Sequence, residues 1–239
     1  MKKGKNIKIF AGLFYLMTVT FLLYLLFSKF SLQEITSYEF IKNNRDYFYE
    51  LKNSNLFQLA ILFILFSVIW VLCAGFGSPL AIFSGFIFGK WIGIFVVVLG
   101  MSIGATGLYV FANYFLKDFI KSKFLKRYRN LKGKFKKSEF FYLLIYRFVG
   151  GIPFAISNVL PCMFNVKISN LFWATMIGMT PQLFLVVSIG SGLEKIIDQN
   201  LEPPRIKDLL FMPDIYIPLF SFFILLIITV FVRRKFYKK

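Results

Sequence analysis

The sequence predicts an all-α integral membrane protein: an inverted repeat of a re-entrant hairpin plus a transmembrane helix, with one flanking span at each end. Three observations predict this class: an apolar composition, basic segments between apolar runs, and helix-breaking residues inside two of those runs. Apolar residues make up 58% of the 239 residues, charged residues only 17%, and the mean hydropathy is +0.69. Soluble domains carry about 45–50% apolar and 25% charged residues. The apolar residues also gather in runs of roughly 18 or more, long enough to cross about 30 Å of hydrocarbon.

The segments before residue 56 are predicted to contain one crossing and one surface segment. Residues 1–28 join a basic start to an apolar run and lack the small-x-small site of a cleaved signal peptide. We therefore expect an N-terminal cytoplasmic segment and a first span. Residues 29–55 carry four basic and four acidic residues among apolar ones, which predicts an external amphipathic segment on the membrane surface.

The first half of the predicted core consists of a broken apolar run, 56–88, and an unbroken one, 91–116. Three residues that disfavour a helix interrupt the first run: Gly75, Gly77 and Pro79. We interpret this run as a hairpin that enters and leaves on one side, followed by a span. The alternative, in which residues 56–74 simply cross the membrane, stays open at this point.

The second half repeats this order after a strongly basic loop. Residues 117–139 contain ten basic residues against two acidic ones, a net charge of +8 that indicates the cytoplasm. The following apolar run, 140–164, is broken at Gly150, Gly151 and Pro153, and residues 168–193 form a span. We expect an external loop at 194–214, then a last span and a basic cytoplasmic tail at 215–239.

The positions of the charges constrain the number of crossings. With the N-terminus and the basic loop inside, an odd number of crossings lies between residues 56 and 116, and the segment 80–89 is too short for three. Each half therefore contains one full crossing, and the second copy is inverted. Inverted repeats are typical of transporters, whose sites lie where broken helices meet near the membrane midplane.

The order of glycine and proline residues in the two halves carries a resemblance to a known family. The segments are Gly77-Ser-Pro-Leu and Gly85-Phe-Ile-Phe-Gly in the first half, then Arg147-Phe-Val-Gly-Gly-Ile-Pro, Ile177-Gly-Met-Thr-Pro and Ile189-Gly-Ser-Gly in the second. Over residues 56–193 the chain resembles the DedA superfamily, in its SNARE-associated Golgi protein (VTT-domain) branch. The resemblance implies paired re-entrant hairpins and a role in moving phospholipids or polyprenyl-phosphate carriers between leaflets. Many bacterial relatives carry a glutamate beside the first hairpin proline, and its absence beside Pro79 puts proton-coupled transport in doubt.

The composition excludes several other kinds of chemistry. The chain has no histidine, and its two cysteines, Cys73 and Cys162, lie far apart in apolar runs. This pattern fits neither a disulfide framework nor a metal site. No nucleophile–base pair is visible, so we predict no enzyme activity and no cofactor. All eleven carboxylates lie in predicted loops or interfaces, which leaves a proton relay without carriers in the membrane.

Two residues are the predicted lipid- or anion-binding residues. Arg147 lies within an apolar segment, where an ionisable side chain is costly and indicates function. Its planar guanidinium suits a phosphate, although an arginine that reaches back to the cytoplasmic headgroups gives the same pattern. Asn158 is expected to bond either a headgroup or the opposite hairpin. A further set of glycines is predicted to allow close helix packing: Gly85, Gly89, Gly93, Gly100, Gly104 and Gly178.

These features together predict a protein of the cell inner (plasma) membrane with both termini in the cytoplasm. The expected function is translocation of a phosphate-bearing lipid between leaflets, without proton coupling. The expected partner is a membrane phospholipid or polyprenyl-phosphate lipid. A homo-oligomer stays open, and no nucleic acid is expected. Two alternatives stay open: a secondary transporter of a small anion, and a non-transporting membrane-homeostasis scaffold.

Overall fold

The computed structural model describes residues 53–124, 138–149 and 152–198, together with isolated positions in the two terminal regions. All regular structure within these ranges is helical, which confirms the all-α class. The elements are α5 (Leu56–Leu72), α6 (Gly77–Phe115), α7 (Lys117–Phe124), α9 (Glu139–Val149), α10 (Phe154–Val159), the 3₁₀ turn η1 (Leu160–Met163) and α11 (Ile168–Asp198). Several predictions lie outside the described residues: the first and last spans, almost all of the segment 29–55, residues 125–137, the breaks at Gly150 and Gly151, and most of the loop 194–214.

Helix α5 ends in a turn that reverses the chain. The N–H of Ala74 donates to the Val71 carbonyl and that of Gly75 to the Trp70 carbonyl, both at 2.9 Å. These two bonds form a Schellman motif, in which Ala74 takes the left-handed position with φ of 60°. Glycine usually occupies that position, so the break begins earlier than the glycines at 75 and 77 predicted. Gly75 instead makes room for a ring, since a Cβ there would lie 2.3 Å from the indole nitrogen of Trp70.

Helix α6 consists of two helical segments that fold back on each other at Gly89. Gly89 has φ of 72° and ψ of −179°, and the Ser84 hydroxyl donates to the Gly93 carbonyl at 2.7 Å. Residues nine apart in a straight helix are about 13.5 Å apart, so the chain reverses here. A Cβ on Gly89 would meet nothing within 4 Å. The prediction that Gly89 serves helix packing was therefore wrong, because the residue supplies a left-handed backbone conformation.

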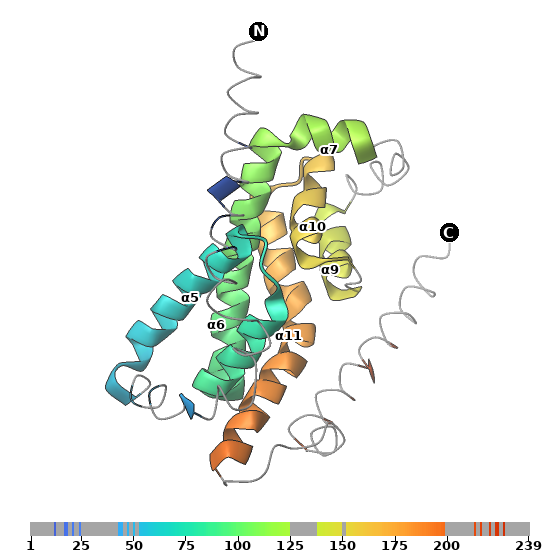
Figure 1. The fold of residues 1–239 in the computed structure, drawn as a ribbon. Coiled ribbons are helices and arrows are strands. Elements are labelled where there is room, and N and C mark those ends of the chain that lie inside the picture. The colour runs from blue at the N-terminus through green and yellow to red at the C-terminus, as the bar shows by residue number, and fades with distance from the viewer. Residues whose placement is uncertain are drawn as a thin grey trace.

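The core of the fold lies between α6 and α11, which run side by side in opposite directions beyond Gly89 (Figure 1). The first segment of α6 touches the backbone of α11 directly. A Cβ on Gly85 would lie 2.0 Å from the Val187 carbonyl oxygen, and one on Gly190 would lie 2.0 Å from that of Ile82. Only glycine allows backbones to approach this closely.

Three further glycines lie at other helix contacts. A Cβ on Gly100 would lie 2.7 Å from the Cβ of Ser67, and a Cβ on Gly104 would lie 2.7 Å from the Cβ of Val71. Both glycines therefore face α5. A Cβ on Gly93 would lie 2.7 Å from the Ser84 carbonyl oxygen, inside the α6 hairpin.

The second half begins with α9, which packs against α11, and continues with α10 and η1, which pack against α6. The Glu139 carboxylate accepts bonds from the Lys167 backbone N–H at 2.6 Å and from the Asn170 side chain at 3.0 Å. This places a negative charge at the start of α11, where the helix dipole favours it. The Tyr109 hydroxyl donates to the Val166 carbonyl at 2.7 Å and joins α6 to the start of α11.

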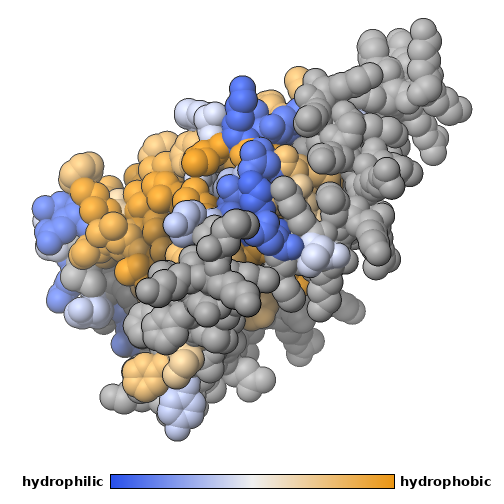
Figure 2. Space-filling model, turned by 90° about the horizontal axis from the view of Figure 1, so that it is seen from above, coloured by the Kyte–Doolittle hydropathy of each residue, from blue (hydrophilic) through white to orange (hydrophobic). Residues whose placement is uncertain are grey.

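The surface of the described helices is strongly apolar. Among the described residues, two helical elements are long and apolar enough to cross a membrane by length and composition: Gly77–Phe115, which reverses at Gly89, and Ile168–Leu193. Large exposed side chains include Phe57, Leu62, Leu65, Phe66 and Ile69 on α5 and Trp91, Ile92 and Phe95 on α6. Figure 2 shows hydrophobic residues over a broad part of one face, beside a group of hydrophilic ones. Soluble monomers rarely expose such patches, so the surface supports a membrane location.

Candidate functional site

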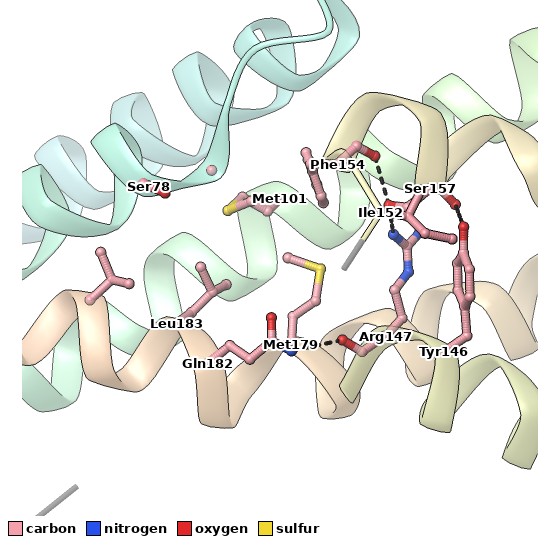
Figure 3. A pocket seen from close by; sticks show the side chains of 12 residues that line it. Ser78, Met101, Tyr146, Arg147, Ile152, Phe154, Ser157, Met179, Gln182 and Leu183 are labelled. Carbon is pink, nitrogen blue, oxygen red and sulfur yellow. Dashed lines mark hydrogen bonds between the residues drawn. The ribbon is translucent and has the colours of Figure 1, made fainter. Parts of the chain in front are cut away.

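A partly open cavity of about 230 Å³ lies where the start of α6 meets α9, α10 and α11. Figure 3 shows Ser78 on one side of this cavity and Arg147 on the other, with Met101, Met179 and Leu183 between them. The residues that line it are Gly77, Ser78, Met101, Tyr146, Arg147, Ile152, Phe154, Ser157, Met179, Gln182, Leu183 and Val186. The cavity therefore joins residues next to both helix breaks, which are about seventy positions apart in the sequence.

Arg147 is held inside the protein by two hydroxyl groups. Its side chain is only 4% exposed, and it lies in the last turn of α9. Its Nε donates to the Thr175 hydroxyl at 3.0 Å and its Nη1 to the Ser157 hydroxyl at 2.7 Å. Its Nη2 has no hydrogen-bond partner among the described residues. The guanidinium thus lies within the fold, a position that argues against an arginine reaching back to surface headgroups.

Neighbouring side chains fix the position of this guanidinium. The Gln182 amide nitrogen donates to the carbonyls of Arg147 and Phe148, at the open end of α9. The rings of Tyr146 and Phe154 have their centroids 5.8 Å and 5.9 Å from the Arg147 Cζ, within cation–π range. The Tyr146 hydroxyl donates to the Ser157 carbonyl at 3.2 Å and ties α9 to α10.

Close packing of α9 on α11 allows this arrangement. A Cβ on Gly178 would lie 2.7 Å from the Cβ of Arg147 and 2.9 Å from the Leu144 carbonyl oxygen. A larger residue at 178 would push α9 away and shift the arginine. Gly178 therefore lies beside the charged residue of the cavity, Arg147.

The cavity is electropositive. Among the described residues, none of the twelve that line it is acidic, and Arg147 is the only basic one. A buried cation with only neutral partners loses several kcal/mol of hydration energy that hydroxyls do not fully replace. The first turn of α6 adds partial positive charge, since the first N–H groups of a helix have no partner inside it and Phe76 gives no side-chain cap.

Other predicted residues lie near the cavity without lining it. Pro79 is in the first turn of α6, and Pro153 is the residue that precedes α10. Asn158 is fully buried in α10, and neither of its side-chain polar atoms has a hydrogen-bond partner in the described ranges. It stays a predicted binding residue, because the structure shows neither of the two contacts expected for it.

Sequence reasoning missed three polar residues that shape the site: Ser157, Thr175 and Gln182. Thr175 and Gln182 lie seven residues apart in the apolar middle part of α11, and this spacing places both on one face of the helix. That pair was the available signal for the α11 side of the site. Ser157 gave none, since it lies beside Asn158 in a short polar stretch.

The comparisons agree with this layout. Residues 76–192 match the VTT domain family, from the start of α6 to near the end of α11. The chain carries a VTT domain. This match and two relatives confirm the resemblance to the VTT-domain branch of the DedA superfamily. The VTT domain includes every residue that lines the cavity.

The curated relatives that match the VTT-domain chain include one from an animal and one from a bacterium. It is 27% identical over 136 residues to the Caenorhabditis elegans Transmembrane protein 41 homolog, covering 54% of this chain and 55% of the relative. It is also 27% identical over 116 residues to the Bacillus subtilis (strain 168) Uncharacterized protein YqeD, and this match covers 47% of this chain and 55% of the relative. The chain thus spans about half the length of the curated relatives it matches. No solved structure matches.

Proposed function

We propose that this VTT-domain protein moves a phosphate-bearing lipid between the two leaflets of a membrane. The headgroup would pass through the cavity while the acyl chains stay in the bilayer. One observation carries the proposal: a buried arginine with an unused N–H group lines a cavity between two helix breaks in an apolar protein. A phosphate oxygen supplies both the missing acceptor and the missing counter-charge.

The proposed pathway needs two hairpins that enter the membrane without crossing it. The reversal at residues 73–76 supports the first, since α5 and the start of α6 form a hairpin beside the longer segment after Gly89 (Figure 1). The turn between α9 and α10 supports the second. The antiparallel course of α11 and the second segment of α6 fits an inverted pair. Irregular backbone at membrane depth is tolerated where it is buried in protein or lines a cavity, as Gly77 and Ile152 do.

The cavity's residues favour movement without proton exchange. In the part of the chain that the structure describes, no aspartate, glutamate or histidine lines the cavity, and these are the usual proton carriers inside membranes. The driving force in this proposal is the lipid gradient or the membrane potential acting on the headgroup charge.

The test measures lipid movement in liposomes that contain the purified protein. Labelled phospholipid in the outer leaflet is quenched by dithionite, and quenching beyond the outer-leaflet share reports translocation. We expect translocation by the unmodified protein and a fall to the level of empty liposomes for Arg147→Met, which keeps the length of the side chain but removes its charge and donors.

Ser188→Ala is the matched control. Ser188 is also buried on α11, but it bonds only the Phe184 carbonyl of its own helix and does not line the cavity. Its variant should translocate lipid like the unmodified protein. Quenching limited to the outer leaflet for folded, unmodified protein would contradict the proposal. Flux of a soluble anion without lipid movement would favour an anion transporter.

A further inference from the structure

We propose that the cavity selects lipids whose headgroup is anionic overall and carries no ammonium group, and that their phosphate bridges the start of α6 and Arg147. This inference rests on the proposed function and names its substrate class. Phosphatidylglycerol is the simplest lipid of this class, whereas phosphatidylcholine and phosphatidylethanolamine are zwitterionic.

The first reason is the uncompensated charge of Arg147. The hydrogen bonds it makes go to neutral hydroxyls, and the Ser157 hydroxyl also donates to the Phe154 carbonyl at 2.7 Å. The Ser157 oxygen is therefore fixed, and the free Nη2 is the group left for a ligand. An anion in the cavity would neutralise this charge in a low-dielectric site, where charge-assisted bonds are strong.

The second reason is the first turn of α6 on the other side of the cavity. The segment from Gly77 to Gly89 is a helix of its own, and Gly77 and Ser78 line the cavity at its start. Helix N-termini bind phosphate through backbone N–H groups and the helix dipole. Arg147 lines the same cavity, and the lack of a hydrogen-bond partner for its buried Nη2 among the described residues is an independent sign of a ligand there. One phosphate that contacts both would join the two halves of the VTT domain.

The third reason is the lack of any feature that would receive an ammonium group. No carboxylate of residues 53–124, 138–149 or 152–198 lines the cavity. The aromatic rings suited to a quaternary ammonium, Tyr146 and Phe154, already lie against the Arg147 guanidinium. Gln182 offers one neutral amide oxygen, which stabilises a cation less than a carboxylate does. An ammonium tethered to the phosphate would add a second cation to a site that already holds an unpaired one.

The size of the cavity agrees with a headgroup as its occupant. Its volume of about 230 Å³ lies below the roughly 300–1,000 Å³ typical of pockets that enclose drug-sized ligands. It therefore has room for a phosphate with a small polar substituent, and the lipid's chains must remain outside.

The selectivity experiment compares three lipids with the same labelled acyl chain: phosphatidylglycerol, phosphatidylcholine and phosphatidylethanolamine. We expect phosphatidylglycerol to move about tenfold faster than the two zwitterionic lipids, and Arg147→Lys, which keeps the charge, to retain part of this preference. Equal rates for all three lipids would overturn this inference and leave the proposed function intact. Movement of none of them would overturn the proposed function as well.

A parallel arm identifies the source of the phosphate group. Liposomes loaded with inorganic phosphate report leakage of the free ion through the same protein. We expect retention of the ion together with movement of phosphatidylglycerol. Release of phosphate at a rate equal to lipid movement would overturn the assignment to a lipid headgroup.

A second experiment tests the backbone of α6 as the other contact. Gly77→Pro removes the N–H at the first helical position, where proline is well tolerated, and Phe76 has the extended ψ of 146° that fits a following proline. Gly77→Ala is the matched control, since it keeps the N–H and adds the same Cβ, 2.5 Å from the flexible end of Met101. We expect phosphatidylglycerol movement to fall several-fold further in the proline variant than in the alanine variant. Equal rates in the two variants would overturn the contact with α6.

Discussion

The two halves of the VTT domain contribute different chemistry to the same cavity. The first half contributes backbone, the start of α6 at Gly77 and Ser78. Just before the domain, a Schellman turn at Ala74 and a ring packed on Gly75 lead into this helix. The second half contributes a charge, Arg147, held by hydroxyls on α10 and α11. The two halves therefore differ in what they place at the cavity: the first brings a helix start, and the second brings a buried charged side chain.

The two halves pack on each other through similar backbone contacts, although they differ in chemistry. Disrupting these contacts should have the largest effect on the stability of the protein. Gly85 and Gly190 each bring a helix backbone to the same distance, with a Cβ 2.0 Å from a facing carbonyl oxygen. Because backbone atoms do not move aside easily, we expect Gly85→Ala and Gly190→Ala each to destabilise the protein by about 3 kcal/mol. Thermal unfolding in detergent, followed by tryptophan fluorescence, measures this.

Gly107→Ala is the control for these two variants. Its Cβ would meet only the Leu72 Cδ2, at 3.3 Å, and that side-chain end can move. We expect a change within about 0.5 kcal/mol. A large loss of stability in only one of the Gly85→Ala and Gly190→Ala variants would show that the two halves do not share this contact equally.

The buried charge of Arg147 should lower the stability of the protein, whereas the close helix contacts at Gly85 and Gly190 raise it. Arg147 is 4% exposed and has no acidic partner among the lining residues, so its burial costs energy that function requires. We expect Arg147→Met to raise the free energy of unfolding by about 1–2 kcal/mol while lipid movement is lost. The same unfolding assay, run beside the translocation assay, measures both. A destabilised Arg147→Met protein would show that the arginine is structural, and the contrast between the halves would then fail.

The difference between the halves also explains how far the sequence predicted the structure. Composition and charge placement predicted the helical class, and the isolated arginine in an apolar run predicted the residue that the cavity contains. Apolar periodicity did not show that Gly89 reverses α6, because one glycine in a long apolar run has the same pattern whether it packs or turns. Ala74 gave no signal either, since nothing local to an alanine indicates a left-handed conformation. Ser157 became recognisable only when folding brought it to Arg147.

The smallest expected effect concerns the strain at the two chain turns. Ala74 in the first half and Asn165 in the second both have left-handed backbones, with φ of 60° and 54°. Asparagine tolerates this conformation better than alanine, and the Asn165 side chain also accepts a bond from Lys117. We expect Ala74→Gly to stabilise the protein by about 0.5–1 kcal/mol and Asn165→Gly to destabilise it by a similar amount. Opposite shifts of the unfolding midpoint support this, whereas shifts in the same direction would show that strain at these turns does not separate the halves.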